Sequence, residues 1–272
     1  MGIHMDSLDD KYLRILLDRI AVSKSYKPKF GNDGEGVSLD KFRSLYGSDP
    51  FYNWFGLDNP LMYAAHKAAG GITSIYRQIG IGGEALLRQL IQDHLGLTSE
   101  QANWSYKTVT SGRPRTLKLD ARIEPLNVAD IDQRQKITNW MQKAARQLQL
   151  EERVAKAMGG IVMEVRQGYK SKDSKRQNAD MANAAEAYTK GYLPILVVLS
   201  NQIDGDIAER YERGKWLVLR GSLEGSDLFS TYAFSREIIG YDLAGFFQRN
   251  NEQLKNFTKD ILESLLRANG DE

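Results

Sequence analysis

A carboxylate and a cation stand two residues apart at the end of an apolar run in the middle of the chain. The run Gly160-Ile161-Val162-Met163 predicts a buried strand, and Glu164-Val165-Arg166 continues it. On a strand, Glu164 and Arg166 lie on the same face. Such a carboxylate can bind Mg²⁺, and such a cation can hold a phosphate or an attacking water, as metal-dependent phosphodiester hydrolysis requires. The alternative is a strand whose charged face forms surface salt bridges.

Further cations follow this strand closely, namely Lys170, Lys172, Lys175 and Arg176. The segment then becomes alanine-rich, which predicts a helix over about residues 174–190. Near the start of that helix, Asp173, Lys175, Arg176 and Asn178 are side chains of the types that pair with base edges in a major groove. The alternative for this segment is a solvated helix start.

Three more carboxylates lie in patterned segments. Asp120 is on the polar face of an alternating strand, Thr116 to Ile123, which is also typical of a solvated strand face. Glu84 follows Gly82-Gly83 at the expected start of an apolar helix, where a glutamate is also common because of the helix dipole. Glu186 lies farther along the alanine-rich helix and is either a second metal carboxylate or simply exposed.

Composition excludes several classes of chemistry. The 272 residues include no cysteine and three histidines, so thiolate nucleophiles, cysteine zinc sites and histidine-rich metal sites are poorly supplied or absent. The net charge of +2 indicates local basic positions rather than a general polycation. No apolar run reaches the ~18 residues of a membrane span, and no signal-peptide pattern opens the chain. We therefore expect a protein without a membrane partner, located in the cytoplasm of a prokaryotic cell.

The order of predicted elements indicates an α/β fold, in which a central mixed sheet is flanked by helices and preceded by a helical N-terminal region. We expect the boundary between these parts near residue 70, giving regions 1–70 and 71–272. Helices are predicted over residues 6–22, 38–46, 60–69, 84–95, 174–190, 226–248 and 250–268, and one or two long helices over residues 132–157. Strands are predicted over residues 104–110, 116–123, 160–168, 193–200 and 216–219.

Together these residues resemble a known nuclease core. A strand aspartate (Asp120), a Glu-x-(Lys/Arg) on the next core strand (Glu164-Val165-Arg166) and an upstream helix glutamate (Glu84) are similar to the PD-(D/E)XK pattern. The downstream run Asp173-Ser174-Lys175-Arg176-Gln177-Asn178-Ala179 resembles the type II restriction endonucleases that read CCGG-centred sites. The chain departs from the family in three places. No proline precedes Asp120, Arg166 stands where the family usually has lysine, and the segment from Asp173 lacks the family's usual Arg-(Asp/Glu)-Arg order.

The resemblance implies a role for each residue. Asp120 and Glu164 would bind Mg²⁺, Glu84 would be an outer or second-site ligand, and Lys170 or Lys172 would orient the attacking water. Alternatively Glu186 replaces Glu164 as the metal carboxylate and acts with Lys172. We favour Glu164, because a glutamate directly after a buried apolar run needs a reason to be there. Base edges would be read by Asp173, Lys175, Arg176 and Asn178, and phosphates would be contacted by Lys107, Arg113 and Arg115.

The resemblance therefore implies a Mg²⁺-dependent type II restriction endonuclease, part of a restriction-modification system. It would hydrolyse double-stranded DNA at a CCGG-containing palindrome. Because two-fold proteins match palindromic sites, it would act as a homodimer or homotetramer. One alternative is a nuclease of the same core that acts in repair or on branched DNA. The other is a non-catalytic DNA-binding protein of this fold.

Overall fold

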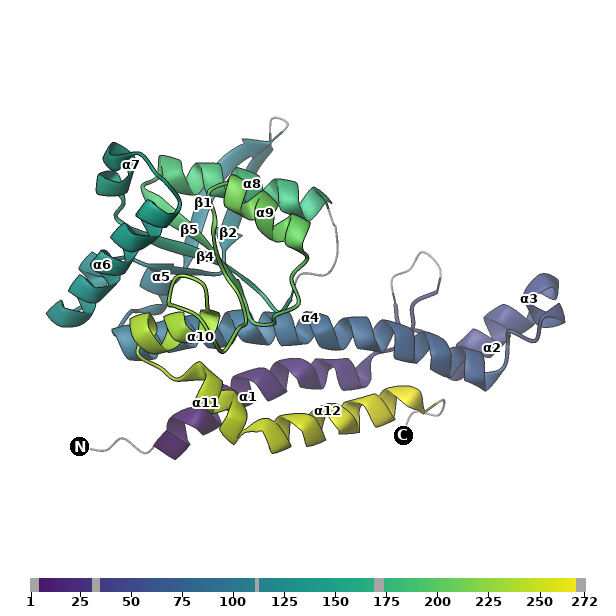
Figure 1. Cartoon of the computed structure of the whole chain (residues 1–272). Coiled ribbons are helices and arrows are strands. Elements are labelled where there is room, and N and C mark those ends of the chain that lie inside the picture. Colours follow the sequence, from purple (N-terminus) through teal and green to yellow (C-terminus); the bar gives the residue numbers. More distant parts are fainter. Residues whose placement is uncertain (1–4, 31–34, 111–112, 169–173, 268–272) are drawn as a thin grey trace. The chain divides into compact units, whose positions relative to one another are not determined.

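The structure is a computed structural model that describes residues 5–30, 35–110, 113–168 and 174–267 (Figure 1). The chain forms two compact units. Unit 1 comprises residues 1–82 and 249–272, and unit 2 comprises residues 83–248. The boundary expected near residue 70 falls inside a long helix that runs on into unit 2.

Unit 1 is helical and is formed by the N-terminal and C-terminal parts of the chain. Its core contains isoleucines from three helices, Ile20, Ile75 and Ile261. The side chain of Asp9 accepts two hydrogen bonds from Arg249, from Nε at 2.7 Å and from Nη2 at 3.1 Å. Its elements are α1 (Met5–Ala21), the 3₁₀ helix η1 (Val22–Ser25), α2 (Leu39–Gly47), α3 (Pro50–Trp54), the first part of α4 (Pro60–Leu95) and α12 (Asn251–Leu266).

Unit 2 is an α/β unit that contains the described strands. After the rest of α4, its elements are α5 (Ser99–Ala102), β1 (Trp104–Thr110), β2 (Arg113–Leu119), β3 (Ala121–Ile123), the 3₁₀ helix η2 (Pro125–Asn127), α6 (Ile131–Gln147), α7 (Glu152–Ala157), β4 (Gly160–Arg166), α8 (Ser174–Thr189), β5 (Tyr192–Val198), α9 (Gly205–Arg213), β6 (Leu217–Leu219), α10 (Thr231–Phe234), the π-helix η3 (Ser235–Ile239) and nearly all of α11 (Leu243–Arg249).

The main sheet is mixed and has the strand order β3-β4-β5-β6. β3 pairs antiparallel with β4, with Ala121 opposite Met163, whereas β4, β5 and β6 are parallel. The strands β1 and β2 form a separate antiparallel hairpin. The expected α/β class and mixed central sheet are confirmed. The near-continuous apolar sequence of β5 fits a strand that is buried on both faces of a parallel sheet.

Helices cover both faces of the main sheet (Figure 1). On one face α8, α9 and the hairpin enclose a core that includes Trp104, Val162, Leu196 and Trp216. On the other face, α6 and α10 meet through the rings of Trp140 and Phe234, 4.9 Å apart. Within the described ranges, no helix combines the length and the apolarity that crossing a bilayer requires.

The structure differs from the predicted pattern around the glycines before Glu84. One continuous helix, α4, replaces the separate helices expected at 60–69 and 84–95, so Glu84 lies within a helix and not in its first turn. Glycine permits close packing here: a Cβ on Gly83 would come 2.4 Å from Leu199 Cδ1, and one on Gly71 would come 2.6 Å from Leu265 Cδ1. These glycines bring neighbouring elements close to α4 and do not begin a helix.

Of the one or two helices predicted over 132–157, the structure has two: the first ends after Gln147 and the second begins at Glu152, with Gln149 between them in the left-handed region (φ 51°). Two other predicted elements are divided. The helix expected over 226–248 is replaced by α10, the π-helix and α11, separated at Gly240 (φ 90°). The strand expected over 116–123 is also interrupted, because Asp120 separates β2 from β3.

Candidate active site

The antiparallel pairing of β3 with β4 brings Asp120 to the Glu164-Val165-Arg166 triplet. The backbone N–H of Asp120 donates to the carbonyl of Met163 at 2.8 Å. Its side-chain Oδ2 accepts a hydrogen bond from the backbone N–H of Val165, also at 2.8 Å. The carboxylate of Asp120 is thereby fixed against the residue between Glu164 and Arg166.

Arg166 is at the centre of a charged cluster, which we call the arginine cluster: Asp120, Glu164, Arg166 and Asp180, of which all but Asp120 are buried. The guanidinium forms an ion pair with Glu164 on its own strand. Its Nη2 also pairs with Asp180 of α8, with a distance of 3.2 Å to Oδ2. Glu164 and Arg166 are each 7% exposed, and Asp180 is 3% exposed. Buried charges of this kind persist in proteins only when they are paired.

Asp180 also accepts a hydrogen bond from a neighbouring helix. Tyr211 of α9 donates its hydroxyl hydrogen to the carboxylate of Asp180. Farther along α8, Asn183 accepts a hydrogen bond from the hydroxyl of Tyr106 at 2.7 Å. The polar face of α8 is therefore satisfied by β4, β1 and α9, which fixes the orientation of Arg166.

The carboxylates around Arg166 keep its guanidinium charged. Burial alone would lower the pKa of Arg166, but Glu164, Asp180 and Asp120 act in the opposite direction and the net pKa is raised. Since an arginine already holds its proton at any physiological pH, this residue cannot act as a general base. It can position carboxylates or stabilise negative charge.

A polar cavity of about 600 Å³ opens beside Asp120. Its charged lining consists of three cationic residues, Arg88, Lys118 and Arg122, and two acidic residues, Glu100 and Asp120. Arg88 lies on α4 and donates from Nε to the backbone carbonyl of Asp120 at 2.8 Å. The cavity is large enough for several waters or a phosphate group, and its cations suit an anion.

The donor atoms of this site fit Mg²⁺. This ion takes oxygen ligands and is commonly held by one or two carboxylates, with waters and substrate phosphates completing its shell. Asp120, directly before β3, and Glu164, on the neighbouring β4, supply one carboxylate each. Within the described residues no group of three or more His, Cys, Asp or Glu side chains could hold a metal. An ion held by Asp120 and Glu164 would share Glu164 with Arg166.

The other two predicted carboxylates lie on helices. Glu84 lies one turn before Arg88 on α4, so the two share a helix face, and Arg88 contacts Asp120. Glu186 lies six positions after Asp180, about 9 Å farther along α8. There it pairs with Lys190 at 3.3 Å, with a third of its side chain exposed. The described contacts link Asp120 to the backbone of Val165, next to Glu164, and pair Glu186 with Lys190.

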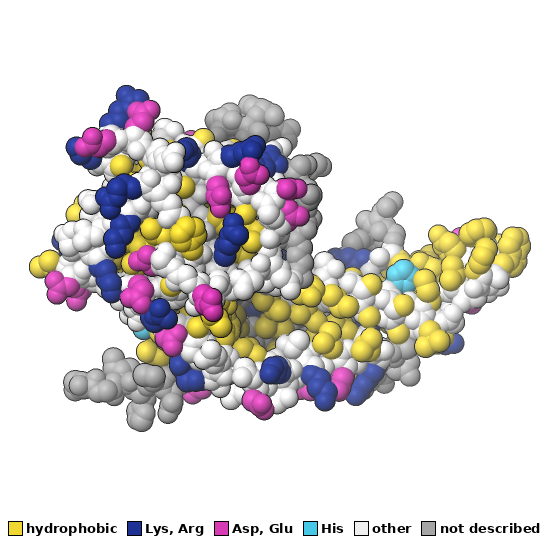
Figure 2. Space-filling model, viewed as in Figure 1, with side chains coloured by type: hydrophobic (Ala, Val, Ile, Leu, Met, Phe, Trp, Pro, Cys, Tyr) yellow, Lys and Arg dark blue, Asp and Glu magenta, His cyan; other side chains and the backbone are white. Residues whose placement is uncertain are grey.

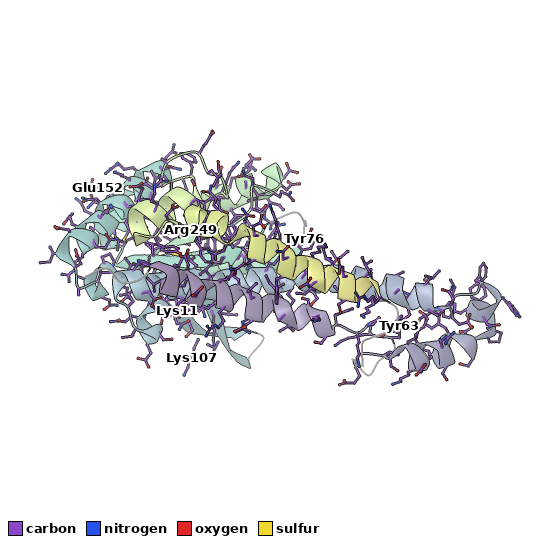
Figure 3. The ribbon with its side chains drawn as sticks, turned by 90° about the horizontal axis from the view of Figure 1, so that it is seen from below. Lys11, Tyr63, Tyr76, Lys107, Glu152 and Arg249 are labelled. Carbon is purple, nitrogen blue, oxygen red and sulfur yellow. The ribbon has the colours of Figure 1, made fainter. Side chains whose placement is uncertain are left out.

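The predicted DNA-contacting residues have different positions. Lys107 is exposed on β1 and projects from the hairpin (Figure 3). Asn178 is exposed on α8, where its side-chain oxygen accepts a hydrogen bond from Arg210 of α9. Four further candidates lie on described backbone, Arg113 and Arg115 in β2 and Lys175 and Arg176 in the first turn of α8. The remaining candidates, Lys170, Lys172 and Asp173, lie outside the described residues.

Sequence reasoning missed Asp180 and Tyr211 as members of the site. A signal for the first was available, because Gln177, Asp180 and Asn183 recur every three residues in α8. They lie on the same face as Ala184 and Ala187, and all five are buried. A polar stripe on the small-residue face of a helix predicts partners in the layer beneath. Nothing local to Tyr211 indicates its partner.

Comparisons of the chain with protein-family models, with curated proteins and with solved structures gave no match. The assignment of function therefore depends on the geometry of the site.

Proposed function

We propose that this protein is a Mg²⁺-dependent endonuclease that hydrolyses phosphodiester bonds in double-stranded DNA. The observation that carries the proposal is the hydrogen bond from the Val165 N–H to the carboxylate of Asp120. It joins an aspartate directly before β3 to a Glu-x-Arg triplet on the neighbouring β4, an arrangement similar to the one that the PD-(D/E)XK resemblance implies.

The described side chains provide binding and orientation. Asp120 and Glu164 would hold the ion, which when bound polarises a phosphodiester and lowers the pKa of a coordinated water. The cationic lining of the cavity, from Arg88, Lys118 and Arg122, suits the phosphates that flank the scissile bond. Arg166 orients Glu164 and stays charged, so proton transfer from the attacking water needs another group. Lys170 and Lys172 remain the candidates for orienting that water.

The finer proposal is a type II restriction endonuclease acting at a CCGG-containing palindrome. It depends on the resemblance of the segment after β4, from Asp173 to Asn178. A palindromic site is matched by two copies related by a two-fold axis, so the active form would be a homodimer or homotetramer. A nuclease of the same core acting in repair or on branched DNA would share the site but would not cut at one fixed sequence.

The ion pair between Arg166 and Glu164 favours a second candidate, a DNA-binding protein that keeps the fold without the chemistry. A carboxylate already neutralised by a guanidinium competes less well for a divalent cation. This candidate predicts DNA binding that is independent of Mg²⁺ and no cleavage.

The test is incubation with long, sequenced double-stranded DNA, with and without Mg²⁺. Asp120→Asn and Glu164→Gln should abolish Mg²⁺-dependent cleavage. The matched control is Glu152→Gln, which changes a carboxylate that is 81% exposed on α7 and should cut like wild type. Discrete fragments support the restriction enzyme, and a smear supports a less selective nuclease. Intact DNA that is nevertheless bound supports the non-catalytic candidate.

A further inference from the structure

In unit 1, a short helix exposes most of its large apolar side chains. α3 contains Pro50–Trp54, and none of its residues is buried. The exposed fractions are 59% for Phe51, 79% for Trp54 and 67% for Phe55, which follows the helix directly. Leu61, in the first turn of α4, is 80% exposed. Figure 2 shows these hydrophobic side chains gathered at the right-hand end of the view, over α2, α3 and the start of α4.

We call this surface the aromatic patch and define it by six residues: Leu45, Phe51, Tyr52, Trp54, Phe55 and Leu61. The exposed parts of its four aromatic side chains amount to on the order of 500 Å². That is the upper range of apolar patches on soluble monomers, and patches of this size commonly mark interaction sites.

The patch is held in place by polar contacts and by ring packing. Asp49 caps α3 by accepting from the backbone N–H groups of Phe51 and Tyr52, and Pro50 occupies the first helical turn. The Tyr52 ring stacks on Tyr46 at 4.9 Å. Tyr46 in turn packs at 4.4 Å on Phe42, which is fully buried.

The same small core reaches α4, where Tyr63 points toward α2 (Figure 3) and its ring lies 5.5 Å from that of Phe42. Isolated helices of five residues are not stable in water, so these contacts specify α3. These contacts order a helix that buries none of its own side chains. The ordered helix therefore holds the aromatic patch exposed on the surface.

We propose that the aromatic patch is the surface through which two copies of this chain associate about a two-fold axis. Charge supports a second copy as the occupant. Between residues 44 and 61 the charged residues are Asp49 and Asp58. Both accept local hydrogen bonds, Asp58 from the Asn53 side chain at 3.2 Å. The six residues of the patch itself are uncharged, so two copies can bury them against each other without burying a charge.

The area of the aromatic patch also fits a second copy of the chain as the partner. A stable interface buries about 800 Å² on each partner, with an aromatic core and a polar rim. The patch supplies the larger part of that area in one contiguous apolar surface, and it is rich in Trp, Phe and Tyr, the residues that dominate interface cores. By contrast, nucleic acid needs cations for its phosphates, and residues 44–61 contain neither Lys nor Arg.

The test measures the oligomeric state of the full chain, without DNA or Mg²⁺, so that its outcome is separate from that of the nuclease proposal. Sedimentation of the wild-type chain should show a concentration-dependent dimer. The double variant Trp54→Glu and Phe55→Glu should weaken association at least about 100-fold, with an unchanged circular dichroism spectrum. The matched control is Leu126→Glu, which changes another leucine that is 80% exposed, outside the patch, and should dimerise normally.

A second measurement uses the absence of cysteine from the chain. Under mild oxidation, Leu61→Cys should form a disulfide-linked dimer and Leu126→Cys should not. A wild-type chain that stays monomeric at all concentrations would overturn the proposal, as would a dimer that the double variant leaves intact. A monomer that instead binds neutral phosphatidylcholine vesicles through the patch would also overturn it.

Discussion

The carboxylate of Asp120 is fixed by the backbone of Val165, whose N–H donates to Oδ2 at 2.8 Å. This contact crosses between two strands and does not depend on the side chain of residue 165. It places the aspartate beside the backbone of the Glu164-Val165-Arg166 triplet. The oxygen that accepts this hydrogen bond belongs to the carboxylate that we propose as a metal ligand.

Because Asp120 serves the fold as well as the proposed chemistry, two substitutions should separate these roles. Asp120→Asn retains an oxygen that can accept from Val165, whereas Asp120→Ala leaves that N–H without its partner. We expect Ala to lower the free energy of unfolding by about 1–3 kcal/mol, and Asn to lower it much less. Cleavage should fall in both by on the order of 10²–10³-fold. Chemical denaturation and a cleavage assay on the same preparations test this, and equal stabilities would contradict it.

Arg166 should be the most sensitive position for stability. In Arg166→Met, Glu164 and Asp180 lose the guanidinium with which both pair in the interior. Leaving buried charges unpaired destabilises proteins by about 3–5 kcal/mol. Arg166→Lys keeps a charge and should be intermediate, because an ammonium cannot reproduce the planar geometry of the guanidinium. Urea denaturation of the three proteins measures the order, and a Met variant as stable as wild type would refute the proposed role of the cluster.

The close approach of β3 to Gly160 gives a matched pair of glycine substitutions. A Cβ on Gly160 would lie 2.7 Å from the backbone oxygen of Ile123, whereas one on Gly159 would meet no atom within 4 Å. Gly160→Ala should therefore destabilise the protein by about 1–3 kcal/mol and shift the strand that leads from Asp120. Gly159→Ala should be neutral or slightly stabilising. Thermal melts of both variants are the measurement, and the prediction is wrong if the two alanines have the same effect.

The sequence predicted the strands of the site well because their patterns are local. The apolar run before Glu164 and the aliphatic run of β5 are recognisable without knowledge of their neighbours. The buried state of Glu164 also followed from that run. The expectation that Asp120 lies inside a strand was wrong by one residue, since it sits between β2 and β3.

The partners of Arg166 could not be predicted in the same way. Asp180 is fourteen positions away on a helix, and Tyr211 comes from the helix after the next strand. These contacts form only because α8 and α9 pack on the sheet, and the sequence pattern of a single element does not reveal that packing. The prediction that a helix begins at the glycines before Glu84 was wrong for a related reason. Glycine disfavours a helix in an isolated segment, but here the side chain of Leu199 packs against Gly83 within a continuous helix.

Alkaline pH should destabilise the protein through its buried tyrosines. Burial raises the pKa of Tyr188 above its usual 10.0, and its hydroxyl donates to the carbonyl of Lys215 at 2.6 Å. Above about pH 10 the unfolded chain loses this phenolic proton first, so the free energy of unfolding falls as the pH rises toward the folded pKa. Tyr188→Phe should be less stable at neutral pH by about 0.5–1.5 kcal/mol, because the hydrogen bond is lost. Denaturation across this pH range should show the difference between the two proteins shrinking above pH 10, and a constant difference would show that Tyr188 does not titrate with unfolding.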